Sequence, residues 1–357
     1  MRILQAGNAN FGYVMARELR KKGFEVDLLI PKQMIAGTIT QINDPLNYDK
    51  DLEYYPEWIY DYDRNKTSKI FHIIRLMRKY DLIHAYNTLP IHAMLSGKPY
   101  LAQSGGDDLR KTAFRKTTQG FLLKTAYKKA NQFVYVWPIH KPYVERLGIK
   151  NAIFLPRIWD TKNFIRKNVK EDGKKSLTIF FPTMEDWGIK GNDKFLKAFV
   201  KLCKEDCDVF LYYVDWGKDS EKAKELLNLP KVKEKTKIIQ GPISRKEMSQ
   251  YMEKSDIIAD QFNSGSFTRL GIESFIFGIP LLINLDENLH TNLHGEAPPI
   301  INGKNEEEIY SKLKELVHSS EVLDEIGRKA HEWGIKHFDL KKNIEKYIQI
   351  YENILKK

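Results

Sequence analysis

One stretch, residues 256–284, holds side chains that together suit a ligand with both negative charge and hydroxyl groups. Its loop at 263–268 is rich in glycine, serine and threonine, so backbone N–H groups, those of Gly265 and Ser266 among them, can lie open to a ligand. Glu273 follows the loop, and a carboxylate there can accept hydrogen bonds from sugar hydroxyls. We expect a binding site in this stretch.

The residues around the loop predict the elements that must hold it in place. The apolar run 257–259 indicates a buried strand, and 269–277 has the composition of a helix. Gly278 is well placed to end that helix, and Pro280 cannot continue it. A second apolar run, 281–283, indicates the next strand. The resulting βαβ unit places the loop at the carboxyl end of a strand and before a helix N-terminus, where such sheets bind anionic ligands.

Glu273 also begins the segment 273–280, E-S-F-I-F-G-I-P, which resembles the E-A-x-x-x-G-x-P signature of the group 1 glycosyltransferases. Members of that family are retaining enzymes in which two Rossmann-like domains face each other across a cleft, the GT-B fold. The family usually has a second glutamate eight residues before the first, but this chain has Gly265 there. The D-Q-F sequence at 260–262 resembles a branch of the family in which glycine occupies that position.

A second stretch, 184–191, resembles the R-x-x-x-x-x-K-G element that holds the donor diphosphate in this family. Lys190 and Gly191 match, whereas Met184 stands in place of the arginine. One lysine offsets the charge of a diphosphate poorly unless a second cation helps. Arg269, beside the loop of the first stretch, is the candidate replacement. The alternative for Arg269 is an exposed arginine at the start of a helix.

Two segments of the first half resemble parts of the GT-B pattern more loosely. Gly7 and Gly12 bound a loop after the first predicted strand, which would face the cleft in a GT-B fold; the alternative is a tight turn between strand and helix. The segment 104–108 resembles the family's G-x-D sequence, which approaches the donor sugar, and Asp108 fits its aspartate best. An aspartate here can also cap the helix that follows, and the two roles are compatible.

The positive charge of the chain is concentrated in its first half. The net charge is +11, and residues 1–160, with 25 basic and 15 acidic residues, account for +10 of it. Two predicted helices, 68–80 and 110–130, supply most of the excess, and the second interleaves aromatic residues with lysines and arginines. This composition suits an anionic membrane surface, but also an ordinary amphipathic helix packed on a sheet. The basic first half contains no recognised nucleic-acid-binding motif, so we expect no nucleic-acid partner.

Other features bear on location and metal binding. The sequence has no apolar run of 18 residues and no charged start followed by an apolar core. Two cysteines, Cys203 and Cys207, fit a reducing compartment. We therefore expect a cytoplasmic protein, held peripherally at the inner membrane face if it binds lipid. His290 and His294 lack an obvious third ligand, so we expect surface or loop histidines and not a metal site.

The fold class that the patterns and the resemblance imply is α/β, with two Rossmann-like doubly wound domains. We expect an acceptor domain over 1–160, a linker over 161–175 and a nucleotide-sugar donor domain over 176–337. A last helix over 338–357 would return to the first domain.

The resemblance implies transfer of a sugar from a nucleotide-sugar to a hydroxyl of a glycan or lipid-linked saccharide, with retention of configuration. The catalytic work would be to stabilise a departing diphosphate and an oxocarbenium-like carbon. Lys190, Arg269 and the N–H groups near Gly265 would hold the diphosphate, and Glu273 would bind the nucleotide ribose. Asp108 and the first loop would lie near the sugar and acceptor. Protein cations and a helix terminus would make a metal cofactor unnecessary.

Two alternatives stay open because the family's glutamate and arginine are replaced by Gly265 and Met184. One is a catalytically weak GT-B module that binds a nucleotide or glycan. The other is a nucleotide-sugar epimerase, which can share this architecture.

Overall fold

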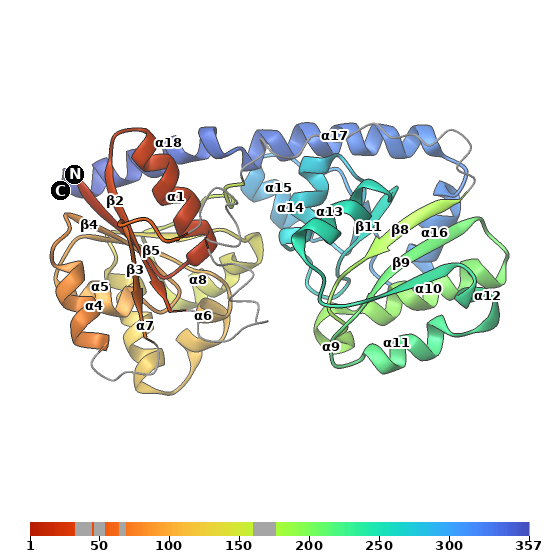
Figure 1. The fold of residues 1–357 in the computed structure, drawn as a ribbon, viewed down its shortest axis with the longest axis horizontal. Coiled ribbons are helices and arrows are strands. Elements are labelled where there is room, and N and C mark those ends of the chain that lie inside the picture. The colour runs from red at the N-terminus through yellow and green to blue at the C-terminus, as the bar shows by residue number, and fades with distance from the viewer. Residues whose placement is uncertain (33–44, 46–53, 64–68, 160–175, 357) are drawn as a thin grey trace. The chain divides into compact units, whose positions relative to one another are not determined.

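The computed structural model describes residues 1–32, 45, 54–63, 69–159 and 176–356. The chain packs into two compact units (Figure 1). The first consists of Met1–Asp160 and Asp339–Lys357, and the second of Thr161–Phe338. The linker expected at 161–175 lies outside the described residues.

The first unit is built on a parallel sheet of seven strands in the order β3-β2-β1-β4-β5-β6-β7. These are β1 (Arg2–Ala6), β2 (Glu25–Pro31), β3 (Ile59–Tyr62), β4 (Leu82–Tyr86), β5 (Tyr100–Gln103), β6 (Gln132–Tyr135) and β7 (Ala152–Phe154). The chain runs outward from β1 to β3 and then returns to β4 on the other side of β1, so the strand order reverses between β1 and β4. Ligands of doubly wound sheets bind at the carboxyl ends of the strands beside such a reversal.

Helices cover both faces of this sheet. They are α1 (Ala9–Lys21), α4 (Lys69–Met77), α5 (Pro90–Ser96), α6 (Asp107–Arg110), α7 (Thr118–Lys129), α8 (Lys141–Leu147) and α18 (Leu340–Leu355), with short 3₁₀ helices η1 (Thr112–Phe114) and η2 (Pro138–His140). The helix α18 packs beside α1, and its Tyr347 and Tyr351 are fully buried. The Tyr351 hydroxyl lies 2.7 Å from His84 Nδ1 and accepts a hydrogen bond from Gln5 Nε2 (3.1 Å), which fixes α18 to β1 and β4.

Two expectations for the first unit are corrected. The helix α1 begins at Ala9, because the Asn8 side chain accepts a hydrogen bond from the Phe11 N–H. Residues 9–12, which the sequence places in a loop, are therefore the first turn of this helix. The single helix predicted over 110–130 is broken into η1 and α7. The break occurs because the backbone of Arg115 is extended and the Thr117 side chain caps a new helix start.

The second unit has a parallel sheet of six strands in the order β10-β9-β8-β11-β12-β13. The strands are β8 (Leu177–Phe181), β9 (Val209–Asp215), β10 (Thr236–Gln240), β11 (Ile257–Ala259), β12 (Leu281–Ile283) and β13 (Ile301–Asn302). The helices are α9 (Trp187–Lys190), α10 (Asn192–Lys204), α11 (Ser220–Leu227), α12 (Pro230–Lys233), α13 (Arg245–Glu253), α14 (Arg269–Phe277), α15 (Glu287–His294), α16 (Glu306–Leu316) and α17 (Ser320–Phe338). The sheet order again reverses, here between β8 and β11, and the expectation of two doubly wound α/β units is confirmed.

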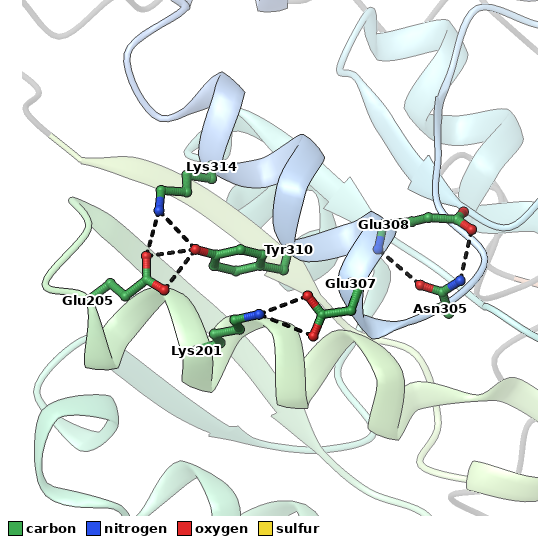
Figure 2. A network of polar contacts seen from close by, with 7 residues as sticks. All are labelled: Lys201, Glu205, Asn305, Glu307, Glu308, Tyr310 and Lys314. Carbon is green, nitrogen blue, oxygen red and sulfur yellow. Dashed lines mark hydrogen bonds and ion pairs between the residues drawn. The ribbon is translucent and has the colours of Figure 1, made fainter.

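Apolar spacing on α10 explains how this sheet is covered. The residues at helical intervals, Phe195, Phe199 and Leu202, are fully buried against the strands. On its outer side α10 meets α16 through the polar contacts of Figure 2. Lys201 Nζ lies 2.8 Å from Glu307 Oε2 and 4.1 Å from the centre of the Tyr310 ring. Such exposed contacts contribute little stability individually, so the buried face does most to hold the helices.

Within the described part of the chain, no helix is both long and apolar enough to span a bilayer.

Candidate functional site

The loop at 263–268 follows β11, and its end is fixed by the buried side chain of Asp260. Asp260 Oδ2 accepts hydrogen bonds from the Thr268 N–H (3.0 Å) and the Thr268 hydroxyl (2.8 Å). Its Oδ1 accepts one from the Thr183 hydroxyl (3.2 Å). Thr268 Oγ1 also accepts from the Leu270 N–H and so caps α14. Because a buried carboxylate requires such partners, Asp260 determines where α14 begins.

Gln261 connects this loop to Lys190. Its Nε2 donates a hydrogen bond to the Ser266 carbonyl (2.6 Å), and its Oε1 accepts one from Lys190 Nζ (2.7 Å). Gln261 is 5% exposed, so these contacts are held in a largely dry environment. Lys190 and Ser266 are 76 residues apart in the sequence. The structure brings both to the carboxyl ends of β8 and β11, where Gln261 contacts each of them.

Two backbone N–H groups of the loop are used inside the protein. The Ser266 N–H donates to Ser264 Oγ (3.3 Å), and the Thr268 N–H donates to Asp260. The expectation of open N–H groups at this loop is therefore wrong for Ser266, whose side chain is also buried. Negative charge on a ligand would be met here mainly by side-chain cations.

Gly265 has a φ of +67°, in the left-handed region that a glutamate adopts only with strain. Its carbonyl accepts a hydrogen bond from the Asp286 N–H (2.9 Å), which fixes this conformation. The family's glutamate would thus not fit the backbone of this loop without rearrangement.

Lys190 is positioned by a short helix that ends at a glycine. Asp186 caps α9 by accepting from the Ile189 N–H, and Gly191 follows with a φ of +69°. A Cβ at position 191 would lie 2.6 Å from Asn263 Oδ1, so only glycine allows this approach. The Lys190 carbonyl accepts a hydrogen bond from the Phe262 N–H (2.6 Å), which joins the two segments a second time.

Glu273 lies at the centre of a cationic cluster. Its side chain is 10% exposed, and its Oε1 accepts hydrogen bonds from Arg245 Nη2 (3.1 Å) and Arg269 Nε (3.3 Å). The two arginine side chains are 31% and 29% exposed, so each is partly open to solvent. Arg269 is therefore not an isolated surface arginine, because it donates a hydrogen bond to the buried carboxylate of Glu273, one helical turn further along α14.

Sequence reasoning missed Arg245. It is the first residue of α13, whose start is fixed by the reciprocal capping of Ser244 and Glu247. No spacing rule links it to Glu273, which is 28 positions later. The capping pattern S-x-x-E would have placed Arg245 at the start of a helix, but not beside α14.

Glu185, close to Lys190 in sequence, is an unusual carboxylic acid. It is fully buried, and its Oε2 accepts a hydrogen bond from the Trp187 indole N–H (2.9 Å). Burial raises the pKa of Glu185 from 4.5 to about 8, and the nearby Asp219 adds to this rise. The group is therefore mostly protonated at neutral pH.

We predict that Glu185 makes the second unit less stable as the pH rises. Because its folded-state pKa lies above the unfolded value, its contribution is fully present below pH 4.5 and is lost as the pH rises through 8. Replacement Glu185→Gln removes this dependence, and we expect the difference from wild type to reach about 1–3 kcal/mol between pH 5 and 9. Urea unfolding across that pH range measures it. Parallel pH profiles for the two proteins would contradict the assignment.

In the first unit, Asp108 lies at the carboxyl end of β5 with both oxygens engaged. Its Oδ1 accepts hydrogen bonds from the N–H groups of Gly105 (3.1 Å) and Gly106 (2.6 Å), and the Tyr127 hydroxyl donates to its Oδ2 (2.5 Å). Asp108 is 8% exposed. These contacts show that the carboxylate holds the loop at 104–108. The capping role given as an alternative is not what the structure shows, because Asp108 is the second residue of α6 and Gly106 occupies the cap position.

Gly7 and Gly12 are in different environments. Gly7 follows β1, and its N–H donates to the Leu29 carbonyl at the carboxyl edge of the sheet. Gly12 is buried inside α1 against Leu28. The expected binding loop is thus reduced to Gly7 and Asn8, and Gly12 contributes helix-to-sheet packing.

Of the two histidines of α15, His290 is fully buried and His294 is partly buried, contrary to the expectation of surface or loop histidines. The His290 ring lies 4.8 Å from the ring of Phe267, and the His294 ring lies 4.9 Å from Trp333. Burial lowers the pKa of His290 to about 4 and that of His294 to about 3, so both are neutral at pH 7. These rings pack behind Phe267 and support the loop from inside.

Residues 161–333 match the protein-family model described as "Glycosyl transferases group 1". The second unit is a group 1 glycosyltransferase domain. The group 1 enzymes are retaining hexosyltransferases, and the chain accordingly carries a glycosyltransferase domain. A search of curated proteins by sequence gives no significant match.

Solved structures resemble this glycosyltransferase over nearly its whole length. HepE of Anabaena, in complex with UDP and glucose, has a TM-score of 0.73 at 11% identity, with 99% of each chain covered. A glycosyltransferase from Rickettsia africae has a TM-score of 0.71 at 19% identity, covering 99% of this chain and 98% of that one. Sucrose-phosphate synthase of Thermosynechococcus elongatus has a TM-score of 0.67 at 14% identity, with 99% of each covered. These likenesses confirm the predicted GT-B-type fold.

Proposed function

We propose that this glycosyltransferase transfers a hexose from a UDP-sugar to a hydroxyl group of a lipid-linked saccharide, with retention of configuration. The observation that carries the proposal is a set of cations in the second unit. Arg245 and Arg269 both donate to the buried carboxylate of Glu273, and Lys190 is held by Gln261, which also contacts the loop at Ser266. The choice of uridine draws on the UDP and glucose bound to Anabaena HepE.

The donor diphosphate would bind to Lys190 and to the exposed parts of Arg245 and Arg269. A departing diphosphate gains negative charge as the bond to the sugar breaks, so fixed cations stabilise the transition state more than the ground state. Arg245 and Arg269 together would replace the arginine that is absent at Met184.

Glu273 would serve the nucleotide ribose through its second oxygen. Both contacts with the arginines use Oε1, and within the described part of the chain Oε2 accepts no hydrogen bond. A carboxylate oxygen that is oriented by two guanidinium groups is well suited to accept hydrogen bonds from the ribose hydroxyls. The loop at Gly265 and Ser266 would then have a steric role and form one side of the diphosphate site.

The first unit would bind the acceptor at the carboxyl edge of its sheet, where Gly7 and Asp108 lie. Asp108 would stabilise the loop at 104–108 there, and Gly12 would allow α1 to pack closely against β2. The protein cations described above would neutralise the diphosphate, so the proposal requires no metal.

The test is an assay of UDP release with UDP-hexoses, with and without a hexosyl-lipid acceptor in detergent. We expect release that depends on the acceptor, and a product whose anomeric configuration by NMR equals that of the donor. Acceptor-independent conversion of the donor sugar would show an epimerase instead. UDP binding without any turnover would show a nucleotide-binding module.

A further inference from the structure

Three neighbouring helices of the first unit carry exposed apolar side chains. The helix α4 packs against α5, and α5 against α7, on the side of the sheet away from α1 and α18 (Figure 1). Phe71 of α4 is 81% exposed, Leu95 of α5 is 47% exposed and Phe121 of α7 is 69% exposed. Large apolar side chains gathered on one layer of helices indicate a surface that contacts a partner.

Cations accompany these side chains in a regular way. Two segments each carry an exposed phenylalanine followed by two exposed basic residues within seven positions. The members are Phe71 and Arg75 on α4 with Arg78 in the turn that follows it, and Phe121, Lys124 and Lys128 on α7. Residues at these spacings lie on the same side of a helix. We call these six residues, with Leu95 between them, the basic aromatic face.

The charge of this face is not neutralised locally. The helices α4, α5 and α7 contain no aspartate or glutamate. In the part of the chain that the structure describes, none of the four cations of the face forms an ion pair with a carboxylate. Their charge is therefore available to an anionic partner.

A hollow at the start of α7 has the same mixed character. This cavity, of about 550 Å³, is lined in part by the rings of Phe114 and Phe121 and by Arg115, Lys116 and Lys124. Apolar walls beside three cations suit a molecule that joins a phosphate to a hydrocarbon chain.

We propose that the basic aromatic face docks on an anionic lipid bilayer. Phe71 and Phe121 enter the boundary between headgroups and acyl chains, and the cations meet the lipid phosphates. A bilayer uses the cations and the apolar side chains at once, whereas a second copy of the same positive face would repel it. The lipid-linked acceptor belongs to the proposed function, which this inference deepens. The docking itself is inferred from the basic aromatic face alone.

Sedimentation with vesicles tests the proposal. Wild type is mixed with vesicles of phosphatidylcholine alone, and with vesicles in which about a third of the lipid is phosphatidylglycerol. The variant Phe71→Ser/Phe121→Ser removes the apolar anchors, and Arg75→Glu/Lys124→Glu reverses two charges. A matched control, Ile238→Ser/Val322→Ser, changes two exposed apolar residues of the second unit, 40% and 49% exposed. All four proteins are titrated with UDP in solution, which shows separately whether the donor site is intact.

We expect wild type and control to bind only the anionic vesicles, and both face variants to bind at least tenfold more weakly. Each basic residue near an anionic leaflet strengthens attachment about fivefold, so the charge reversals have the larger effect. Equal binding to neutral vesicles, face variants that bind like the control, or displacement of the protein from vesicles by RNA would overturn the proposal. Intact vesicle binding without sugar transfer would instead refute the proposed function and leave the docking face in place.

Discussion

Replacement of Lys190 by alanine is expected to lower kcat/KM for sugar transfer by about 100- to 1000-fold. The Lys190 ammonium is held at the carboxyl end of β8 by Gln261, and in the proposed mechanism it faces the diphosphate as charge develops. A cation that acts on developing charge affects kcat more than the binding of the donor in its ground state. Initial rates over a range of UDP-sugar concentrations separate the two effects.

Lys197→Ala is the matched control for this variant. Lys197 lies on α10 and is 46% exposed, where it pairs with Asp193 in the same helix (3.0 Å). Its loss is expected to change kcat/KM by less than twofold, because an exposed pair contributes little. If Lys190→Ala retained the activity of Lys197→Ala, the proposed role of Lys190 would be wrong.

Replacement of Glu273 by alanine is expected to destabilise the second unit by roughly 1–3 kcal/mol and to weaken UDP binding at least tenfold. The change leaves Arg245 and Arg269 close together with no carboxylate between them, so both lose a partner and repel each other. It also removes the oxygen proposed to bind the ribose. Urea unfolding and calorimetric titration with UDP measure the two losses.

A double-mutant cycle shows whether the cluster acts as one unit. The combined variant Arg245→Ala/Glu273→Ala is expected to lose less stability than the sum of the single variants, because the second change removes a repelling charge. The control is Glu332→Ala, which breaks an exposed pair with Arg328 and is expected to cost less than about 0.5 kcal/mol. Strictly additive losses at 245 and 273 would show that the ion pair seen in the structure has no energetic effect.

The central stretch was predictable because its signals are local. The apolar runs at 257–259 and 281–283 and the helix at 269–277 have the bounds that the sequence indicates. Gly278, in the left-handed conformation, ends that helix as predicted. Each of these elements depends on residues within a few positions of itself, so one sequence is sufficient.

The contacts that complete the site depend on distant parts of the chain. The bridge of Gln261 between Lys190 and Ser266, and the pairing of Arg245 with Glu273, exist only because separate βα units pack side by side. The D-Q-F sequence indicated a branch of the family, but gave no reason why the glutamine is there. Its physical reason is that an amide both donates and accepts, and so can join a carbonyl to an ammonium.

The wrong expectations share a physical cause. The N–H groups of the loop were expected to face a ligand, but those of Ser266 and Thr268 donate to the side chains of Ser264 and Asp260. His290 and His294 were expected at the surface or in a loop because no third metal ligand was evident, yet both lie on α15 against an aromatic cluster that contains Phe267. In both cases tertiary packing overrides the local pattern.

The most direct test of the central claim, that the second unit binds a nucleoside diphosphate through its cationic site, is calorimetric titration of UDP into wild type, Lys190→Ala and Lys197→Ala. The account predicts binding of one UDP per chain to wild type and Lys197→Ala, at least tenfold weaker binding to Lys190→Ala, and little difference among the three with uridine, which lacks the phosphates. Failure of UDP, GDP and ADP alike to bind wild type, or equal UDP affinity in all three proteins, would contradict it.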